Sequence, residues 1–285
     1  IIKKGQKMLA NSRYILGVCL ISAGLVIILF SPEVNTYSSR AEVAETNNDF
    51  LPNAPYGKAI GIFPGRVVWS WNPDATDENC TNTMNDPARG EDGYFLAKNS
   101  DQPVIDKMLD DAVMRLTGTY SLGNAWERLF ADFNKRTGNG EKNYAAGEKV
   151  FVKINQGGGG WLTNSSDLSF LTDNWAEEYY GIAETSPQVV ISLLKQLVNE
   201  FGIAEEDIYV GDPIAHIYKH NYEQMMAFFP DVKYVDKSHS DLGRTLLTVS
   251  DEPAVFYSDK GTVMENAITD KLYNEFAEAD YIINV

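Results

Sequence analysis

From residue 100 onward, the spacing of apolar and polar positions predicts helices that alternate with short strands. Apolar residues recur at helical spacing over 103–116, 122–135 and 187–198. Short runs rich in Val, Ile and Tyr predict strands at 150–154, 207–211, 232–235, 254–257 and 281–285. This alternation predicts an α/β fold, with a mainly parallel sheet flanked by helices and built from Rossmann-like βαβ units.

Local signals mark the start of the helix over 187–198 and predict two further helices. Ser186-Pro187 and Asp212-Pro213 each combine a capping side chain with a proline at the first turn. We therefore expect one helix to begin at Ser186 and another to run from Asp212 to about Phe229. A third helix is expected over 268–277.

The first 57 residues follow a different pattern. Residues 1–13 form a basic end that should stay in the cytoplasm, and residues 14–30 form an apolar run without a charge. Its length predicts an N-terminal transmembrane or signal helix. We expect a bacterial membrane anchor with an extracytoplasmic (periplasmic) soluble domain, or a secreted chain if the segment is cleaved. Residues 31–57 predict a flexible linker, and 58–285 the α/β domain, which ends in a strand-like run and is expected to be incomplete at its C-terminus.

Charge and cysteine content narrow the classes of partner. Residues 31–285 contain 20 basic and 40 acidic side chains. Such a surface repels phosphate backbones, so no nucleic acid partner is expected. Cys80 is the sole cysteine beyond residue 30, which leaves no disulfide framework.

Ligands of parallel α/β sheets gather at the carboxyl ends of the strands, and the first polar cluster there is Lys153 and Asn155. Four glycines follow, among them Gly157 and Gly158, whose backbone amides could close on an anionic group. We expect Asn155, Gly157 and Gly158 to contact substrate. The alternative is a loop with no ligand.

The second cluster begins with Asp212, a candidate base or metal ligand. His216, His220 and Glu223 follow at spacings of four and three, so on a helix from Asp212 they would share one face. Two imidazoles and a carboxylate suit a divalent transition metal. An ordinary amphipathic helix is the alternative.

The third cluster contains His239, Asp241 and Arg244. Arg244 could clamp an anion, and His239 could move a proton. A solvated loop is the alternative. The sequence contains no G-x-S-x-G and no H-E-x-x-H motif, so the common hydrolase and zinc-protease signatures are absent.

Several runs together resemble the domain of unknown function 362 family, in particular its long, exported bacterial members. They are GIFPGRVVW (61–69), NPDAT (72–76), DGYF (92–95), KVFVKIN (149–155), SPQVVISLLKQLV (186–198), IYVGDP (208–213) and FPDVKYVD (229–236). The resemblance extends in pieces over 61–285. The strand–Pro-helix–strand segment is also similar in pattern to the nickel-dependent lactate racemase group.

The resemblance implies no particular reaction. Some relatives are joined to iron–sulfur modules, but this chain lacks the cysteines, so no iron–sulfur cluster is expected. Relatives usually continue beyond the Asn284-Val285 position into a section that bears Lys and His.

Two functions stay open at this point. In the first, an exported enzyme acts on a small anionic metabolite: Lys153 and Arg244 hold the anion, Asn155 orients it, and Asp212 is the base or metal ligand. In the second, the chain is a non-catalytic extracytoplasmic ligand-binding module. A titratable group of perturbed pKa would favour the enzyme, and a lining of aromatic residues such as Trp161 and Trp175 would favour binding alone.

Overall fold

A central sheet organises the chain in the computed structural model, which describes residues 16–21, 24–29, 57–81, 92–94, 96–156, 184–237, 240–256 and 269–285. The strands are β1 (Leu16–Ile21), β2 (Gly24–Leu29), β3 (Val68–Ser70), β4 (Val150–Lys153), β5 (Ile208–Gly211), β6 (Lys233–Val235), β7 (Val249–Phe256), β8 (Thr269–Tyr273) and β9 (Tyr281–Asn284). The helices are α2 (Gln102–Thr117), α3 (Leu122–Arg136), α7 (Pro187–Leu194, continued by a π-helical turn over Lys195–Glu200), α8 (Lys219–Phe228) and α9 (Asn274–Glu278).

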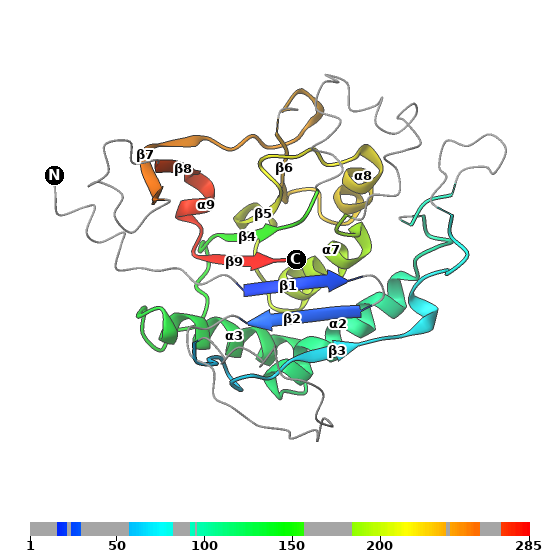
Figure 1. The fold of residues 1–285 in the computed structure, drawn as a ribbon, viewed down its shortest axis with the longest axis horizontal. Helices are drawn as coiled ribbons and strands as arrows, with labels where there is room; N and C mark the ends of the chain where they lie inside the picture. The colour runs from blue at the N-terminus through cyan, green and yellow to red at the C-terminus, as the bar shows by residue number, and fades with distance from the viewer. Residues whose placement is uncertain are drawn as a thin grey trace, which may run out of the picture.

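The strands of the main sheet lie in the order β3-β2-β1-β9-β4-β5-β6 (Figure 1). Strands β9, β4, β5 and β6 are parallel to one another, and β1 joins β9 in parallel. Strands β2 and β3 extend the sheet in the antiparallel sense. The predicted α/β fold with a mainly parallel sheet is confirmed.

Strands β7 and β8 form a separate antiparallel hairpin. The strand predicted at 254–257 therefore exists in part as β7 but lies outside the main sheet. The helix predicted over 268–277 is wrong over its first half. There the backbone pairs with β7 as β8, and only the five residues of α9 are helical.

Within the apolar run at 14–30, where a helix was expected, residues 16–21 and 24–29 form the antiparallel strands β1 and β2, with Leu16 paired with Leu29 and Ile21 with Gly24. An unbroken apolar run suits a buried strand as well as a helix, so hydrophobicity alone does not distinguish them. Among the residues that the structure describes, no helix is long and apolar enough to span a bilayer. The linker predicted at 31–57 lies outside the described residues except for Gly57.

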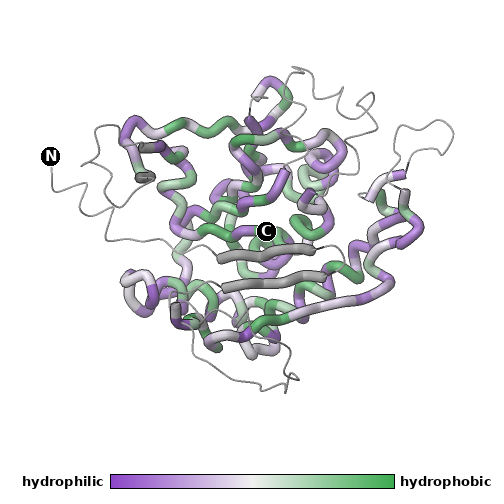
Figure 2. The backbone as a smooth tube through the Cα atoms, viewed as in Figure 1, coloured by the Kyte–Doolittle hydropathy of each residue, from purple (hydrophilic) through white to green (hydrophobic). Residues whose placement is uncertain are grey.

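Each face of the sheet has its own apolar layer, because successive residues of a strand point to opposite sides. Val150 and Val152 of β4 pack into a core shared with α2, α3, α7 and α8, and this face carries most of the buried apolar side chains. Figure 1 shows where these helices lie, and Figure 2 colours the apolar stretches of the backbone green. Phe151, between them, faces the other side and packs edge-on against Phe276 of α9, with ring centroids 5.1 Å apart. The second face thus has a thinner cover.

The helices on the thick side end where their sequences predict. Asp101 caps α2 by accepting a hydrogen bond from the Val104 N–H at 3.0 Å, and Gly118 ends it with a left-handed φ of 66°. Ser121 caps α3 in the same way. These caps fix the layer against which β4 and β9 pack.

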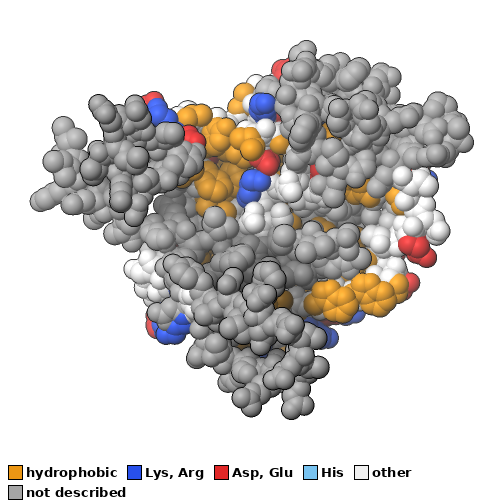
Figure 3. All heavy atoms as spheres, viewed as in Figure 1, with side chains coloured by type: hydrophobic (Ala, Val, Ile, Leu, Met, Phe, Trp, Pro, Cys, Tyr) orange, Lys and Arg blue, Asp and Glu red, His pale blue; other side chains and the backbone are white. Residues whose placement is uncertain are grey.

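Aromatic side chains are exposed at the edge of the main sheet that β3 forms. Trp69 of β3 and the following Trp71 stack with centroids 6.5 Å apart and stay 65% and 54% exposed. Figure 3 shows hydrophobic side chains at the surface of this view of the molecule. A stacked pair on an edge strand shields part of its own apolar area without a partner.

Candidate functional site

The carboxyl ends of β4 and β5 bring Lys153 and Asp212 together. The two strands pair with Lys153 opposite Gly211, so the next residue, Asp212, lies beside the lysine. Lys153 Nζ is 2.9 Å from Asp212 Oδ2 and also donates to the Ile154 carbonyl at 2.6 Å. The Asp212 side chain is 7% exposed and that of Lys153 is 29% exposed. Solvent therefore reaches this ion pair mainly from the side of the lysine.

Asp212 does not begin a helix, so the helix predicted from Asp212 is wrong over residues 212–218. Asp212 Oδ1 instead accepts the backbone N–H of Ile214 at 3.2 Å, and α8 begins only at Lys219. The intervening loop stays non-helical because the Ile217 N–H donates to Asp236 Oδ2 at 2.7 Å, across to the end of β6.

Asp236, at the end of β6, pairs with His216. The His216 Nδ1 lies 2.9 Å from Asp236 Oδ1, and the side chains are 2% and 0% exposed. Asp236 is not among the site residues predicted from the sequence. Its signal was its place directly after the strand at 232–235, the same place that Asp212 has after β5.

The three residues proposed as metal ligands do not share a helical face. His216 precedes α8 and pairs with Asp236, whereas His220 lies in the first turn of α8 and stacks on Tyr218, with ring centroids 5.5 Å apart. Glu223 is exposed. Within the described parts of the chain, no group of three His, Cys, Asp or Glu side chains is arranged to hold a metal ion.

Asn155 lies at the base of the glycine-rich loop, next to the start of α7. Its backbone N–H donates to Thr185 Oγ1 at 2.9 Å, and its carbonyl accepts from the Thr185 N–H at 2.9 Å. These bonds fix the backbone and leave the Asn155 side chain exposed. Gly157 and Gly158 lie outside the described residues.

A group of titratable side chains lies near the starts of α7 and α8. Of its members, only His220 was a site residue predicted from the sequence. Burial lowers the pKa of His220 to about 3. Burial, and then the charge of Glu184, raise the pKa of Tyr94 and of Tyr218 well above the ordinary tyrosine range. Asn221 Nδ2 donates to Tyr94 Oη at 3.4 Å. Side chains with perturbed pKa values are frequent at active sites, and this cluster lies on the side of the sheet where α/β proteins bind ligands.

Arg244 lies beyond β6 and apart from the Lys153–Asp212 pair. The neighbouring Thr245 forms a parallel bridge with Val235, and its N–H donates to the Tyr234 carbonyl at 2.7 Å. Since β5 and β6 both lie between β4 and this bridge, Arg244 is separated from Lys153 by two strands. The anion clamp expected from Lys153 and Arg244 acting together stays a prediction.

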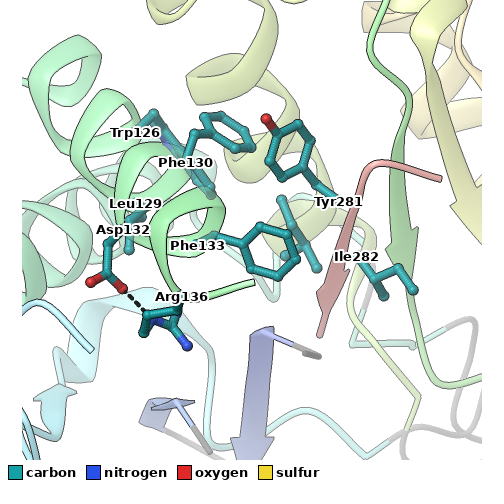
Figure 4. Close-up of a pocket in the computed structure, with 9 residues that line it drawn as sticks. Trp126, Leu129, Phe130, Asp132, Phe133, Arg136, Tyr281 and Ile282 are labelled. Atoms are coloured by element: carbon teal, nitrogen blue, oxygen red, sulfur yellow. Dashed lines mark hydrogen bonds and ion pairs between the residues drawn. The ribbon is translucent and has the colours of Figure 1, made fainter. Parts of the chain in front are cut away.

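A small cavity lies on the helical side of the sheet, between α3 and β9 (Figure 4). Its volume is about 30 Å³, room for one or two water molecules. Phe130 and Tyr281 meet there edge-on at 4.5 Å, and the Asp132–Arg136 ion pair lies at its rim. The cavity is a packing gap among aromatic rings and is too small for a metabolite.

The geometry at the ends of β4, β5 and β6 thus consists of two carboxylates that follow successive strands, each paired with a basic side chain. Comparison of the chain with protein-family models, with curated proteins and with solved structures gave no match.

Proposed function

We propose that the domain is an enzyme that acts on a small anionic metabolite at the carboxyl edge of the sheet. The observation that carries the proposal is the 2.9 Å ion pair between Lys153, which reaches solvent, and Asp212, which is almost buried. We further propose that the strand–helix units around it are Rossmann-like, the arrangement that places ligands at this edge.

The pair offers two chemical groups to one ligand. The ammonium of Lys153 can take an anionic oxygen while it stays bonded to Asp212, because it has three donors. Asp212 Oδ1 is oriented by the Ile214 N–H, which holds the carboxylate in one position. A fixed carboxylate beside a bound anion is placed to act as a general base. Asn155, with its backbone fixed and its side chain exposed, would orient the ligand.

A non-catalytic binding module is the alternative. The enzyme is favoured by the lowered pKa of His220 and by the buried His216–Asp236 pair, since a capture site has no need of either. The resemblance to the domain of unknown function 362 family stays a prediction and adds no reaction.

The proposal also concerns location. The basic end and the uncharged run at 14–30 support export to the membrane, with the domain outside the cytoplasm. The same run forms β1 and β2 in the sheet, so a chain anchored through it would have to hold its domain together without these strands.

The ligand can be sought by thermal unfolding against a panel of small carboxylates and phosphate esters. We expect a ligand to raise the Tm of the wild type, and Lys153→Met to abolish the rise. Lys149→Met is the matched control, because Lys149 pairs with Glu278 at the opposite end of the strand region, at 3.6 Å. Lys153→Arg keeps the charge beside Asp212 and guards against a variant that fails to fold.

Asp212→Asn separates the two functions. An enzyme would keep ligand binding and lose turnover of the bound ligand, followed by NMR of the ligand itself. A ligand that binds equally well after Lys153→Met would contradict the site, and an unchanged ligand spectrum with every binding compound would favour the binding module.

A further inference from the structure

We propose that Arg244 forms a separate binding site for a carboxylate group, which it holds side-on through Nε and Nη2. The site does not depend on the proposed function, because Arg244 has its own supports and lies apart from Lys153 and Asp212.

Two contacts fix the guanidinium group in space. Arg244 Nη1 donates to the Leu242 carbonyl at 2.8 Å, and the guanidinium carbon lies 3.7 Å from the centre of the Tyr222 ring. Tyr222 is itself held, because its hydroxyl donates to the Gly243 carbonyl at 3.2 Å and its ring meets that of Tyr234 edge-on at 5.4 Å. The plane and the direction of the guanidinium are therefore set before any ligand arrives.

The remaining edge of the guanidinium is unused. Arg244 is 7% exposed, yet neither Nε nor Nη2 has a hydrogen-bond partner among the residues that the structure describes. A buried donor without a partner is costly, and charge makes it more so. The Nε and Nη2 hydrogens point the same way in one plane, which is the fork that a carboxylate accepts with its two oxygens.

The surroundings favour a carboxylate over a phosphate ester. Asp236, Glu223 and Asp241 surround Arg244 with negative charge, and the domain as a whole is strongly acidic. A dianion would be repelled about twice as strongly as a monoanion by these charges. The Tyr222 ring occupies one face of the guanidinium, so the in-plane edge of Nε and Nη2 is the direction left for a planar monoanion.

Arginine side-chain NMR tests the site directly. The full chain, labelled with ¹⁵N-arginine, is titrated with sodium acetate, with sodium phosphate and sodium chloride at matched ionic strength as comparators. Arg244→Lys identifies the Arg244 Nε–H signal. We expect acetate to move this signal along a saturable curve, with an affinity at least about tenfold higher than that for phosphate.

Arg66 provides an internal control in the same spectrum. Its Nη1 donates to the Arg115 carbonyl at 2.8 Å and its guanidinium lies 3.7 Å from the Phe63 ring, but Arg66 is exposed. Its signal should follow ionic strength alone. The titration repeated in Lys153→Met should give the same curve for Arg244, whatever becomes of the Lys153 site.

Three outcomes would overturn the inference: an Arg244 signal that acetate does not move, a shift that all three salts cause equally, or loss of the response in Lys153→Met. If Arg244→Lys does not fold, phenylglyoxal labelling of the wild type gives the same readout. Acetate should protect Arg244 and leave Arg66 reactive, as measured by peptide mass spectrometry.

Discussion

His216 Nδ1 lies 2.9 Å from Asp236 Oδ1, with both side chains buried, and this contact ties the loop after β5 to the end of β6. The same carboxylate takes the Ile217 N–H with its other oxygen. The Asp236 side chain thereby holds residues 213–218 in a loop, so they do not extend α8.

Asp236→Asn should destabilise the domain by about 2 kcal/mol, because a buried amide replaces a carboxylate that accepts two hydrogen bonds. Urea unfolding followed by circular dichroism measures the change. Asp241→Asn, an exposed aspartate of the 3₁₀ turn at Ser240–Leu242, should stay within about 0.5 kcal/mol of the wild type. Equal stability of the two variants would show that the His216–Asp236 contact contributes nothing.

Gly211→Ala should be among the most destabilising single changes, with a loss of about 3 kcal/mol or more. A Cβ at this position would overlap the Val235 carbonyl oxygen, which belongs to the neighbouring strand β6 and cannot move alone. Thermal unfolding tests this. Gly123→Ala in α3, where a Cβ would meet only ordinary contacts, should be neutral or gain about 0.5–1 kcal/mol. A tolerated Gly211→Ala would mean that β5 and β6 are farther apart than described.

Stability should fall as the pH drops below about 6.5, partly through His220. Its folded pKa of about 3 lies below the unfolded value of 6.5, so the unfolded chain binds the extra proton first. Between those two pKa values, His220 alone changes the unfolding free energy by about 1.4 kcal/mol per pH unit. Above pH 6.5 the imidazole is neutral in both states, and this loss of stability is absent. Unfolding free energies of wild type and His220→Gln, measured from pH 7 to pH 4, should differ in slope by one proton. Parallel curves would contradict a buried, neutral His220.

The run at 14–30 leads to a fractionation experiment. We expect the full chain to stay in the carbonate-washed membrane fraction of a bacterial host, and residues 31–285 to be soluble and folded, because the uncharged run is long enough to span a bilayer. A soluble full chain, together with an unfolded 31–285, would instead place residues 16–29 permanently in the sheet as β1 and β2.

The sequence predicts the parts of the fold in which local signals and tertiary packing agree. α2 and α3 have capping residues and apolar stripes, and β4, β5, β6 and β9 are short β-branched or aromatic runs bounded by polar residues. Their paired carboxyl ends made Lys153 and Asp212 candidates, and the structure places them in contact.

The failures occur where a distant partner overrides a local signal. Asp212-Pro213 looks like a helix start, but Asp236, 19 positions from Ile217, captures the backbone of the loop. Residues 269–273 pair with β7 instead of forming a helix, and no local sequence pattern predicts that pairing. The contacts of Arg244 with Tyr222 and Leu242 likewise depend on how the loop after β6 folds back, which no local pattern predicts.

The position of β9 between β1 and β4 has a consequence for synthesis on the ribosome. Lys149, beside β4, bonds to Asp280, beside β9, across 131 positions of chain. One side of β4 stays bare until those residues have been added, which takes roughly 10 s at the usual rates of translation. The nascent chain must therefore keep a hydrophobic strand uncovered while these 131 positions are added. Chaperone capture in that interval should decide the yield of folded protein more than the final stability does.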